Sequence, residues 1–328
     1  MFLILSSQND YAANYAIEWL IYMNYNFVRI NENDKIIFEK ILLKNKKYEI
    51  FIKIVFANNK KIQRININKI KGYWYRRDSF NTENFYLKNN INENFIFSIN
   101  RYKQTENESI IDFLHTYLKR INHVNSFEDN NFNKLNDLMM VGETKIKIPK
   151  TLITNSKKEV VKFKKQVGSI ITKATRFGGG LMNNEIGFSG FTNILDDKTI
   201  KGLPNYFDYS VIQELIKKKY DIRVFYLNEK FYSAVILSQN KTKTKIDFRT
   251  EQGPETRMVP YKLPNYIENE MIKILNKMRL NCCSIDFVLD KKKHFYFLEI
   301  NPVGQFSFIS KRCNYNLEKK VIEAITKK

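Results

Sequence analysis

The sequence predicts a mixed α/β (α+β) fold made of several lobes, and two observations support this prediction. The first is a strand, helix, strand order at the start of the chain, where apolar runs at 2–5 and 27–30 flank a helical pattern. The second is a C-terminal part in which short apolar strands alternate with amphipathic helices. With 328 residues, the chain is long enough for two or three lobes with their own cores.

The N-terminal lobe begins with the strand at 2–5 and a helix. That helix should bury one face, formed by Ala13, Ile17, Leu20 and Ile21. Further strands are expected at 48–56 and 72–77, and a closing helix at 110–121. The Asn-rich stretch 122–133 is expected to be a linker.

The second lobe is expected to begin near Lys134 with a helix over 135–141, followed by a strand at 152–154. Ser156 and Glu159 have the spacing of a capping box, which predicts the start of another helix. A strand over 169–175 then runs into three consecutive glycines, Gly178–Gly180. Glycine destabilises helix and strand interiors, so these residues predict a loop.

The third lobe should contain five strands and two helices. The strands are predicted at 209–214, 221–227, 232–238, 282–289 and 295–300, and the helices at 264–278 and 317–325. The predicted domains therefore span 1–125, 126–206 and 207–328.

The composition is that of a globular protein, with 43% apolar and 27% charged residues. The 55 basic and 34 acidic residues give a net charge of +21, but lysine is scattered and no RNA-binding motif occurs. We therefore expect no nucleic-acid partner. No apolar run approaches the ~20 residues that cross a bilayer, and the three cysteines form no disulfide framework. A cytoplasmic protein without a membrane partner is expected.

Two carboxylates near the C-terminus are the most informative residues. Asp286 and Glu299 stand among apolar strand residues, where an unpaired charge would be costly. Asn301 follows Glu299 by two positions and shares its strand face. Such a set of hard oxygen ligands suits Mg²⁺. The alternative is a buried acid pair bridged to lysine.

Other residues indicate a nucleotide site. Lys173 stands in a strand before the glycine loop, where it could reach a phosphate, whereas Lys134 alone is weak evidence. The run Gln213-Glu214-Leu215-Ile216 could hydrogen-bond an adenine edge. Asp221 could hold ribose hydroxyls, while Arg223 on the same face would point toward phosphates. Arg249 could clamp a phosphoryl group or a carboxylate. The alternative is an edge strand with ordinary surface charges.

Together, the order of these motifs resembles the ATP-grasp superfamily. Within it the chain is similar to the maturases of graspetides, including the microviridin ligases, and most similar to the grasp-with-spasm peptide maturases. Three segments carry this resemblance: Tyr73-Trp74-Tyr75-Arg76-Arg77, Ile148–Asn155, and Phe297-Leu298-Glu299-Ile300-Asn301-Pro302-Val303-Gly304-Gln305-Phe306. The opening adds Asp10, Trp19 and Arg29. The resemblance covers essentially the whole chain.

The resemblance implies an ATP-grasp fold with an N-terminal pre-ATP-grasp domain, a central lid and a C-terminal ATP-grasp lobe. It also implies roles for individual residues: Lys134 and Lys173 on ATP phosphates; Gln213, Glu214 and Ile216 at the adenine; Asp221 at the ribose; Asp286, Glu299 and Asn301 on Mg²⁺; and Arg223 and Arg249 at the acyl phosphate. A precursor leader peptide would dock at about residues 184–201. The pair Cys282-Cys283 departs from the relatives, which should affect packing more than chemistry.

The implied activity is ATP-dependent peptide macrocyclisation, with ATP and Mg²⁺ as cofactors and a ribosomally made precursor peptide as partner. A peptide Asp or Glu carboxylate would be activated as an acyl phosphate and joined to a Ser or Thr hydroxyl or a Lys amine. Two alternatives stay open: a ligase that adds a free amino acid to a carboxylate, and a non-catalytic peptide-binding scaffold. A homodimer is also left open. The three histidines stand in no motif.

Overall fold

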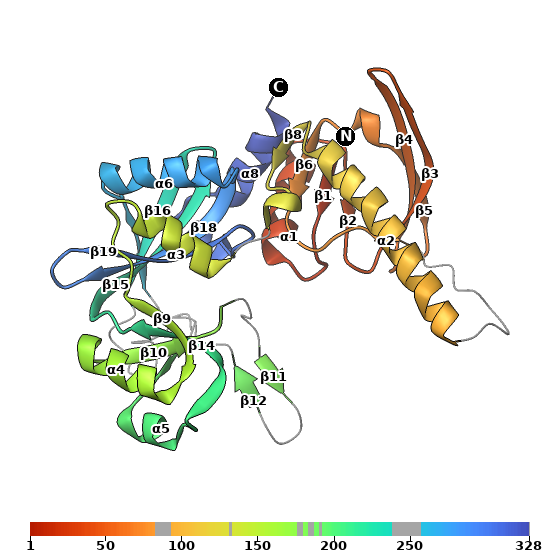
Figure 1. The fold of residues 1–328 in the computed structure, drawn as a ribbon. Coiled ribbons are helices and arrows are strands. Elements are labelled where there is room, and N and C mark those ends of the chain that lie inside the picture. Colours follow the sequence, from red (N-terminus) through yellow and green to blue (C-terminus); the bar gives the residue numbers. More distant parts are fainter. Residues whose placement is uncertain are drawn as a thin grey trace. The chain divides into compact units, whose positions relative to one another are not determined.

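The computed structural model describes residues 1–82, 93–130, 133–175, 180–182, 187–189, 192–237 and 257–327, and it has the expected mixed α/β fold. The chain divides into two compact units (Figure 1). Unit 1 comprises Met1–Asn131, Gln305–Ser310 and Asn316–Lys328, and unit 2 comprises Phe132–Gly304 and Lys311–Tyr315. The finer division into three domains stays a prediction.

Unit 1 is built on a parallel sheet in the order β2-β1-β6-β8. Its strands are β1 (Phe2–Leu5), β2 (Phe27–Ile30), β6 (Gly72–Tyr75) and β8 (Asn122–Val124). The expected βαβ opening is confirmed. The linker prediction is wrong at β8, because this short strand has only one buried apolar residue, Val124, and so shows no pattern.

Both faces of this sheet are covered by helices. Gly72 lies against α8 (Leu317–Thr326), whereas Tyr73 meets His115 of α2 (Glu93–Leu118). The helix α1 (Tyr11–Tyr22) buries Ala12, Ala13, Ala16 and Leu20. Ile21, which we expected on the buried face, is 64% exposed, since small alanines form that face instead. The helix α2 also starts well before the expected residue 110. Residues 100–109 contain only one apolar side chain, Tyr102, so the helical pattern does not continue back to its start.

A second, antiparallel sheet of unit 1 has the order β5-β4-β3-β7, in which only the short β7 pairs in parallel. Its strands are β3 (Lys35–Lys44), β4 (Lys47–Val55), β5 (Ile62–Asn66) and β7 (Asn81–Thr82). Of these, only β4 was expected. A bulge between Phe38 and Lys40 interrupts the alternation of β3, which hides the strand in the sequence. Single turns of 3₁₀ helix follow at Ile67–Lys69 and Glu128–Asn130.

Unit 2 contains an antiparallel sheet in the order β13-β10-β14-β9. The strands are β9 (Thr151–Ser156), β10 (Ile170–Lys173), β13 (Asn193–Ile194) and β14 (Tyr206–Glu214), with the helices α4 (Lys157–Val167) and α5 (Asp197–Gly202) and the hairpin β11 (Gly180–Met182) and β12 (Gly187–Ser189). Ser156 is the N-cap of α4, but its side chain makes no capping bond. We expected β14 among the third-lobe strands, yet it pairs with β9 and β10.

The other sheet of unit 2 has the order β17-β16-β15-β18-β19. It consists of β15 (Lys218–Leu227), β16 (Lys230–Ile236), β17 (Met258–Tyr261), β18 (Cys282–Asp290) and β19 (Phe295–Asn301). One face packs with α3 (Lys134–Gly142) and α6 (Asn265–Lys277) around a core that includes Ile222, Val224 and Ile285. By alternation, Asp221, Arg223 and Asp286 lie on the opposite face. The helix α7 (Ser307–Arg312) follows β19.

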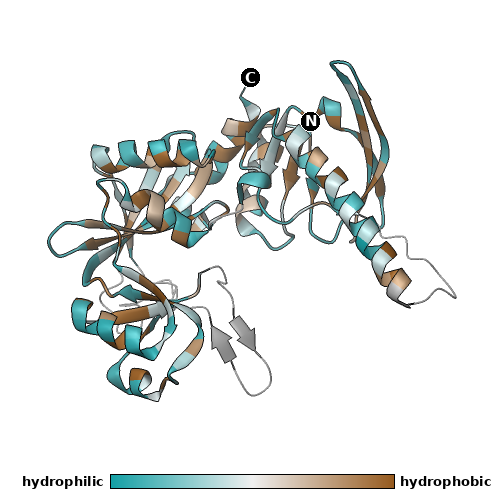
Figure 2. Cartoon of the chain, viewed as in Figure 1, coloured by the Kyte–Doolittle hydropathy of each residue, from teal (hydrophilic) through white to brown (hydrophobic). Residues whose placement is uncertain are grey.

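Hydropathy follows this layering, with brown strands beneath the teal outer faces of the helices (Figure 2). Within the described ranges, no helix is both long and apolar enough to cross a bilayer.

Candidate active site

Three charged side chains lie side by side on neighbouring strands of the sheet β17-β16-β15-β18-β19. In the strand register, Arg223 of β15 lies opposite Asp286 of β18, and Asp286 lies opposite Glu299 of β19. The Arg223 guanidinium is 2.6 Å from the Asp286 carboxylate, measured from Nη1 to Oδ2. All three residues are less than a tenth exposed. Two buried carboxylates therefore lie side by side, on the sheet face opposite the core that α3 and α6 cover.

A β-bulge accompanies this arrangement. The pairing passes from Asp286 with Glu299 to Phe287 with Phe297, so Leu298 is the extra residue. Two positions beyond Glu299, the Asn301 amide nitrogen donates to Glu299 Oε1 at 2.9 Å. Asp286, Glu299 and Asn301 are thus brought together, although the bulge itself could not be read from the sequence.

Lys134 reaches this group from the first turn of α3, with its Nζ 2.9 Å from Glu299 Oε2. The helix begins here because Asn133 is the N-cap and its side chain accepts the Leu135 N–H. β19 is the edge strand beside α3, which explains how a lysine of this helix meets a carboxylate of the sheet. Lys134 was a weak candidate by sequence alone.

Asp137, one turn further along α3, was missed by the sequence analysis. It is 2% exposed, and burial together with the nearby Glu299 carboxylate raises its pKa to about 7, partly offset by Lys134. Among the residues that the structure describes, none forms a hydrogen bond with its Oδ2. The sequence did offer a signal for Asp137. It is an acidic residue next to Leu138 on the apolar face of a short helix, where a charge is costly unless it has a role.

The donor set fits a magnesium ion. Asp286 and Glu299 supply carboxylate oxygens, and Asn301 donates through its nitrogen, which leaves its oxygen as a ligand atom. Among the described residues, no group of three or more His, Cys, Asp or Glu side chains is arranged to hold a metal. Two carboxylates and one amide oxygen suit Mg²⁺, which binds one or two carboxylates and completes its shell with substrate phosphates and water.

The residues expected at the adenine lie at the end of β14. Glu214 and Ile216 line a cavity of about 650 Å³, together with Lys147 and Tyr296. Its volume lies within the usual range for a small-molecule site. Gln213 does not line it: this side chain is 1% exposed, and its Nε2 donates to Thr151 Oγ1 at 2.8 Å.

Of the remaining candidates, the structure describes Lys173 and Asp221 but not Arg249. Lys173 ends β10 opposite Val211, and Asp221 is buried and bound through both oxygens by Lys218 Nζ, at 2.8 and 2.7 Å. Sequence reasoning missed Lys218. Arg249 and residues 176–179, which include most of the glycine loop, lie outside the described residues.

Gly304 is a further residue that the sequence analysis did not single out. A Cβ at this position would lie 2.5 Å from Ser284 Cβ and 2.9 Å from Arg223 Nη2. The turn after β19, in which the Gly304 N–H donates to the Asn301 carbonyl, therefore packs directly on these side chains. Only glycine fits this approach without displacing Arg223.

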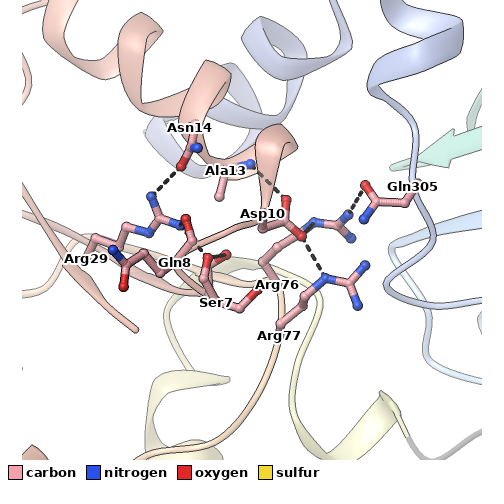
Figure 3. Close-up of polar contacts among 10 residues, drawn as sticks. Ser7, Gln8, Asp10, Ala13, Asn14, Arg29, Arg76, Arg77 and Gln305 are labelled. Atoms are coloured by element: carbon pink, nitrogen blue, oxygen red, sulfur yellow. Dashed lines mark hydrogen bonds and ion pairs between the residues drawn. The ribbon is translucent and has the colours of Figure 1, made fainter. Parts of the chain in front are cut away.

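A second charged cluster lies in unit 1, at the carboxyl ends of β1 and β6 (Figure 3). Asp10 accepts from the Ala13 N–H and pairs with Arg76 at 3.1 Å and Arg77 at 2.7 Å. Arg76 also donates to Gln305 Oε1 at 3.2 Å. Arg76 and Asp10 are each 2% exposed, so the network is buried. Its contact with Gln305 joins Gln305–Ser310 to the rest of unit 1.

Comparisons with known proteins give the family and the fold of the chain. The family model of the RimK-like ATP-grasp domain matches residues 131–325. Macrocyclase MdnC from Microcystis aeruginosa MRC, solved bound with precursor peptide MdnA, has a TM-score of 0.74 at 20% identity, with 99% of each chain covered. A RiPP-associated ATP-grasp ligase of Chryseobacterium gregarium, in complex with ADP and a leader and core peptide, has the same TM-score and identity, with 99% of this chain and 96% of that one covered.

Curated relatives match a smaller share of the chain than these solved structures do. Uncharacterized protein MG012 of Mycoplasma genitalium is 29% identical over 132 residues, or 40% of this chain and 44% of that protein. The match thus spans less than half of that relative. The alpha-aminoadipate–LysW ligase LysX of Sulfolobus acidocaldarius is 20% identical over 267 residues, or 74% of this chain and 90% of that one. The family model covers more than half of the chain and confirms the expected superfamily: the chain belongs to the RimK-like ATP-grasp family.

Proposed function

We propose that this protein is an ATP- and Mg²⁺-dependent ligase that closes rings in a ribosomally made precursor peptide. The observation that carries the proposal is the row of Arg223, Asp286 and Glu299, with Asn301 and Lys134 beside it. Similarity along 99% of the chain to a macrocyclase solved with its precursor peptide supports a peptide as the substrate.

In the proposed reaction, a side-chain carboxylate oxygen of the peptide attacks the γ-phosphorus of ATP, giving an acyl phosphate and ADP. A Ser or Thr hydroxyl, or a Lys amine, of the same peptide then attacks the carbonyl carbon and releases phosphate. Asp286, Glu299 and Asn301 would hold Mg²⁺, which offsets phosphate charge in such transfers. Lys134 and Lys173 would bind phosphates, and Arg223 and Arg249 would stabilise the charge at the reacting carboxylate.

The nucleotide would lie with its adenine near Glu214 and Ile216, whose cavity has the size for it, and its ribose near Asp221. Gln213 would support this region from beneath through its bond to Thr151. We further propose that a leader peptide docks near residues 184–201, that the enzyme forms a homodimer, and that it acts in the cytoplasm. The three cysteines are buried thiols, which fits a reducing compartment.

One other function has a specific observation in its favour. The similarity to LysX, an alpha-aminoadipate–LysW ligase, favours an enzyme that joins a free amino acid to a carboxylate. Both functions would use the same activation step, so only the product separates them.

The test is incubation with ATP, Mg²⁺ and the cognate precursor, followed by mass spectrometry and an ADP assay. Ring closure lowers the peptide mass by about 18 Da per ring, because each condensation removes one water. A peptide that gains a residue mass would replace this proposal with the amino-acid ligase. No ADP release with the precursor would leave the non-catalytic scaffold.

A further inference from the structure

Residues 35–71 of unit 1, which contain β3, β4 and β5, form a strongly basic part of the chain. Eleven basic residues stand there against only Glu39 and Glu49, whereas the whole chain has 55 basic and 34 acidic residues in 328. A codon bias toward lysine explains basic residues everywhere, but it does not explain a local loss of acids. The segment therefore requires its own explanation.

The sheet presents much of this charge on one face. Ile50, Ile52 and Ile54 of β4 are fully buried, so the alternate residues Phe51 and Lys53 point away from the core. We call this side of β3–β5 the outer face.

Like charges oppose one another across the strands of the outer face. Lys53 stands opposite Arg64, and Lys44 stands opposite Lys47. Directly opposed like charges destabilise an antiparallel pair. Glu39 offsets the charge of Arg64 at 2.6 Å. The Lys44–Lys47 pair is not favoured by folding alone, which indicates a surface suited to an anionic partner.

Carboxylates already bind on this sheet. Lys40 pairs with Glu49 at 2.5 Å, and Arg64 pairs with Glu39 at 2.6 Å. The Arg64 guanidinium also lies 4.2 Å from the centroid of the Phe51 ring. This cation covers the ring on which a nucleic-acid base would stack, so the face favours carboxylates over a nucleic acid.

We propose that the outer face of β3–β5 is a docking surface for an acidic peptide, namely the Asp- and Glu-containing region of the peptide substrate. The inference rests on the proposed function, and it names a binding surface outside the catalytic residues. A field of this sign speeds the encounter with an acidic chain and fades as salt screens it over ~8–10 Å.

The test compares two triple variants. Lys44→Gln, Lys47→Gln and Lys53→Gln remove three charges from the outer face and relieve both like-charge pairs, so the sheet should stay folded. The matched control changes three exposed lysines of unit 2, namely Lys262→Gln, Lys273→Gln and Lys277→Gln. Circular dichroism and ADP binding with Mg²⁺ verify that both variants are intact.

The probe is a fluorescein-labelled synthetic peptide rich in Asp and Glu, titrated at low and at physiological salt. The outer-face variant should bind it about tenfold more weakly at low salt, as expected for the loss of three surface charge contacts. The control variant should change by less than about twofold, and the difference should shrink at physiological salt. A copy with Asn and Gln in place of the acids should bind weakly to all proteins.

Two results would overturn the docking surface. One is an equal loss of affinity for the acidic peptide in the outer-face and control variants, which would mean that only the net charge of the protein matters. The other is selective loss of binding to single-stranded DNA, or to phosphatidylserine vesicles, while peptide binding is retained. Ring formation is scored separately: if the acidic peptide docks here but no ring forms, the proposed function fails alone. If rings form with an unchanged KM for the precursor in the outer-face variant, the docking surface fails alone.

Discussion

At the scale of single residues, the account depends most on Asp286 and Glu299. Asp286→Asn or Glu299→Gln removes one charge from the proposed magnesium site and should weaken Mg²⁺-dependent ADP binding at least about tenfold, since hydrogen bonds involving a charge contribute ~1.5–3 kcal/mol. Calorimetric titration with ADP over a range of Mg²⁺ concentrations measures this. Glu270→Gln on α6, whose carboxylate pairs with Lys273, is the control. Wild-type ADP affinity in both site variants would refute the metal assignment.

His115 gives a pH prediction at the same scale. Burial lowers its pKa to about 3, and the ring stacks on Phe127 at 4.2 Å. Between that pKa and ~6.5, only the unfolded chain takes up this proton, so the free energy of unfolding should fall as the pH falls, by up to about 1.4 kcal/mol per pH unit. Urea unfolding of His115→Gln from pH 7 to pH 5 should show a flatter dependence. His123→Gln, which retains His115, is the control, and a slope in His115→Gln as steep as in wild type would contradict the prediction.

At the scale of elements, Gly72 sets how closely β6 approaches α8. An added Cβ would lie 2.3 Å from the Ile325 carbonyl oxygen and 2.9 Å from the Phe2 ring. Gly72→Ala should therefore lower the free energy of unfolding by about 1–3 kcal/mol, the usual cost of overpacking. A Cβ added at Gly202 would meet no atom of the described residues within 4 Å, so Gly202→Ala serves as the control. Equal midpoints for the two variants in thermal unfolding would show that α8 is not held as described.

Elements also show how far the sequence could lead. β15, β18 and β19 were predictable because their apolar runs are long and bury one full face. β3, β5 and β8 were not, because a bulge, a charged face or a length of three residues removes the local pattern. Asp286, Glu299 and Asn301 could be proposed from spacing within two strands. The partners Lys218 and Asp137 depend on which elements meet, and spacing does not encode that.

At the scale of the whole molecule, the central claim is that this member of the RimK-like ATP-grasp family activates a peptide carboxylate. The most direct measurement uses a precursor whose Asp and Glu side-chain carboxylates carry ¹⁸O, incubated with ATP and Mg²⁺. If the carboxylate attacks the γ-phosphorus, each ring that closes must transfer one ¹⁸O atom to the released phosphate. Mass spectrometry of the phosphate should therefore show one label per ring. Rings that form while the phosphate stays unlabelled would contradict the account, because the carboxylate would then not have been the activated group.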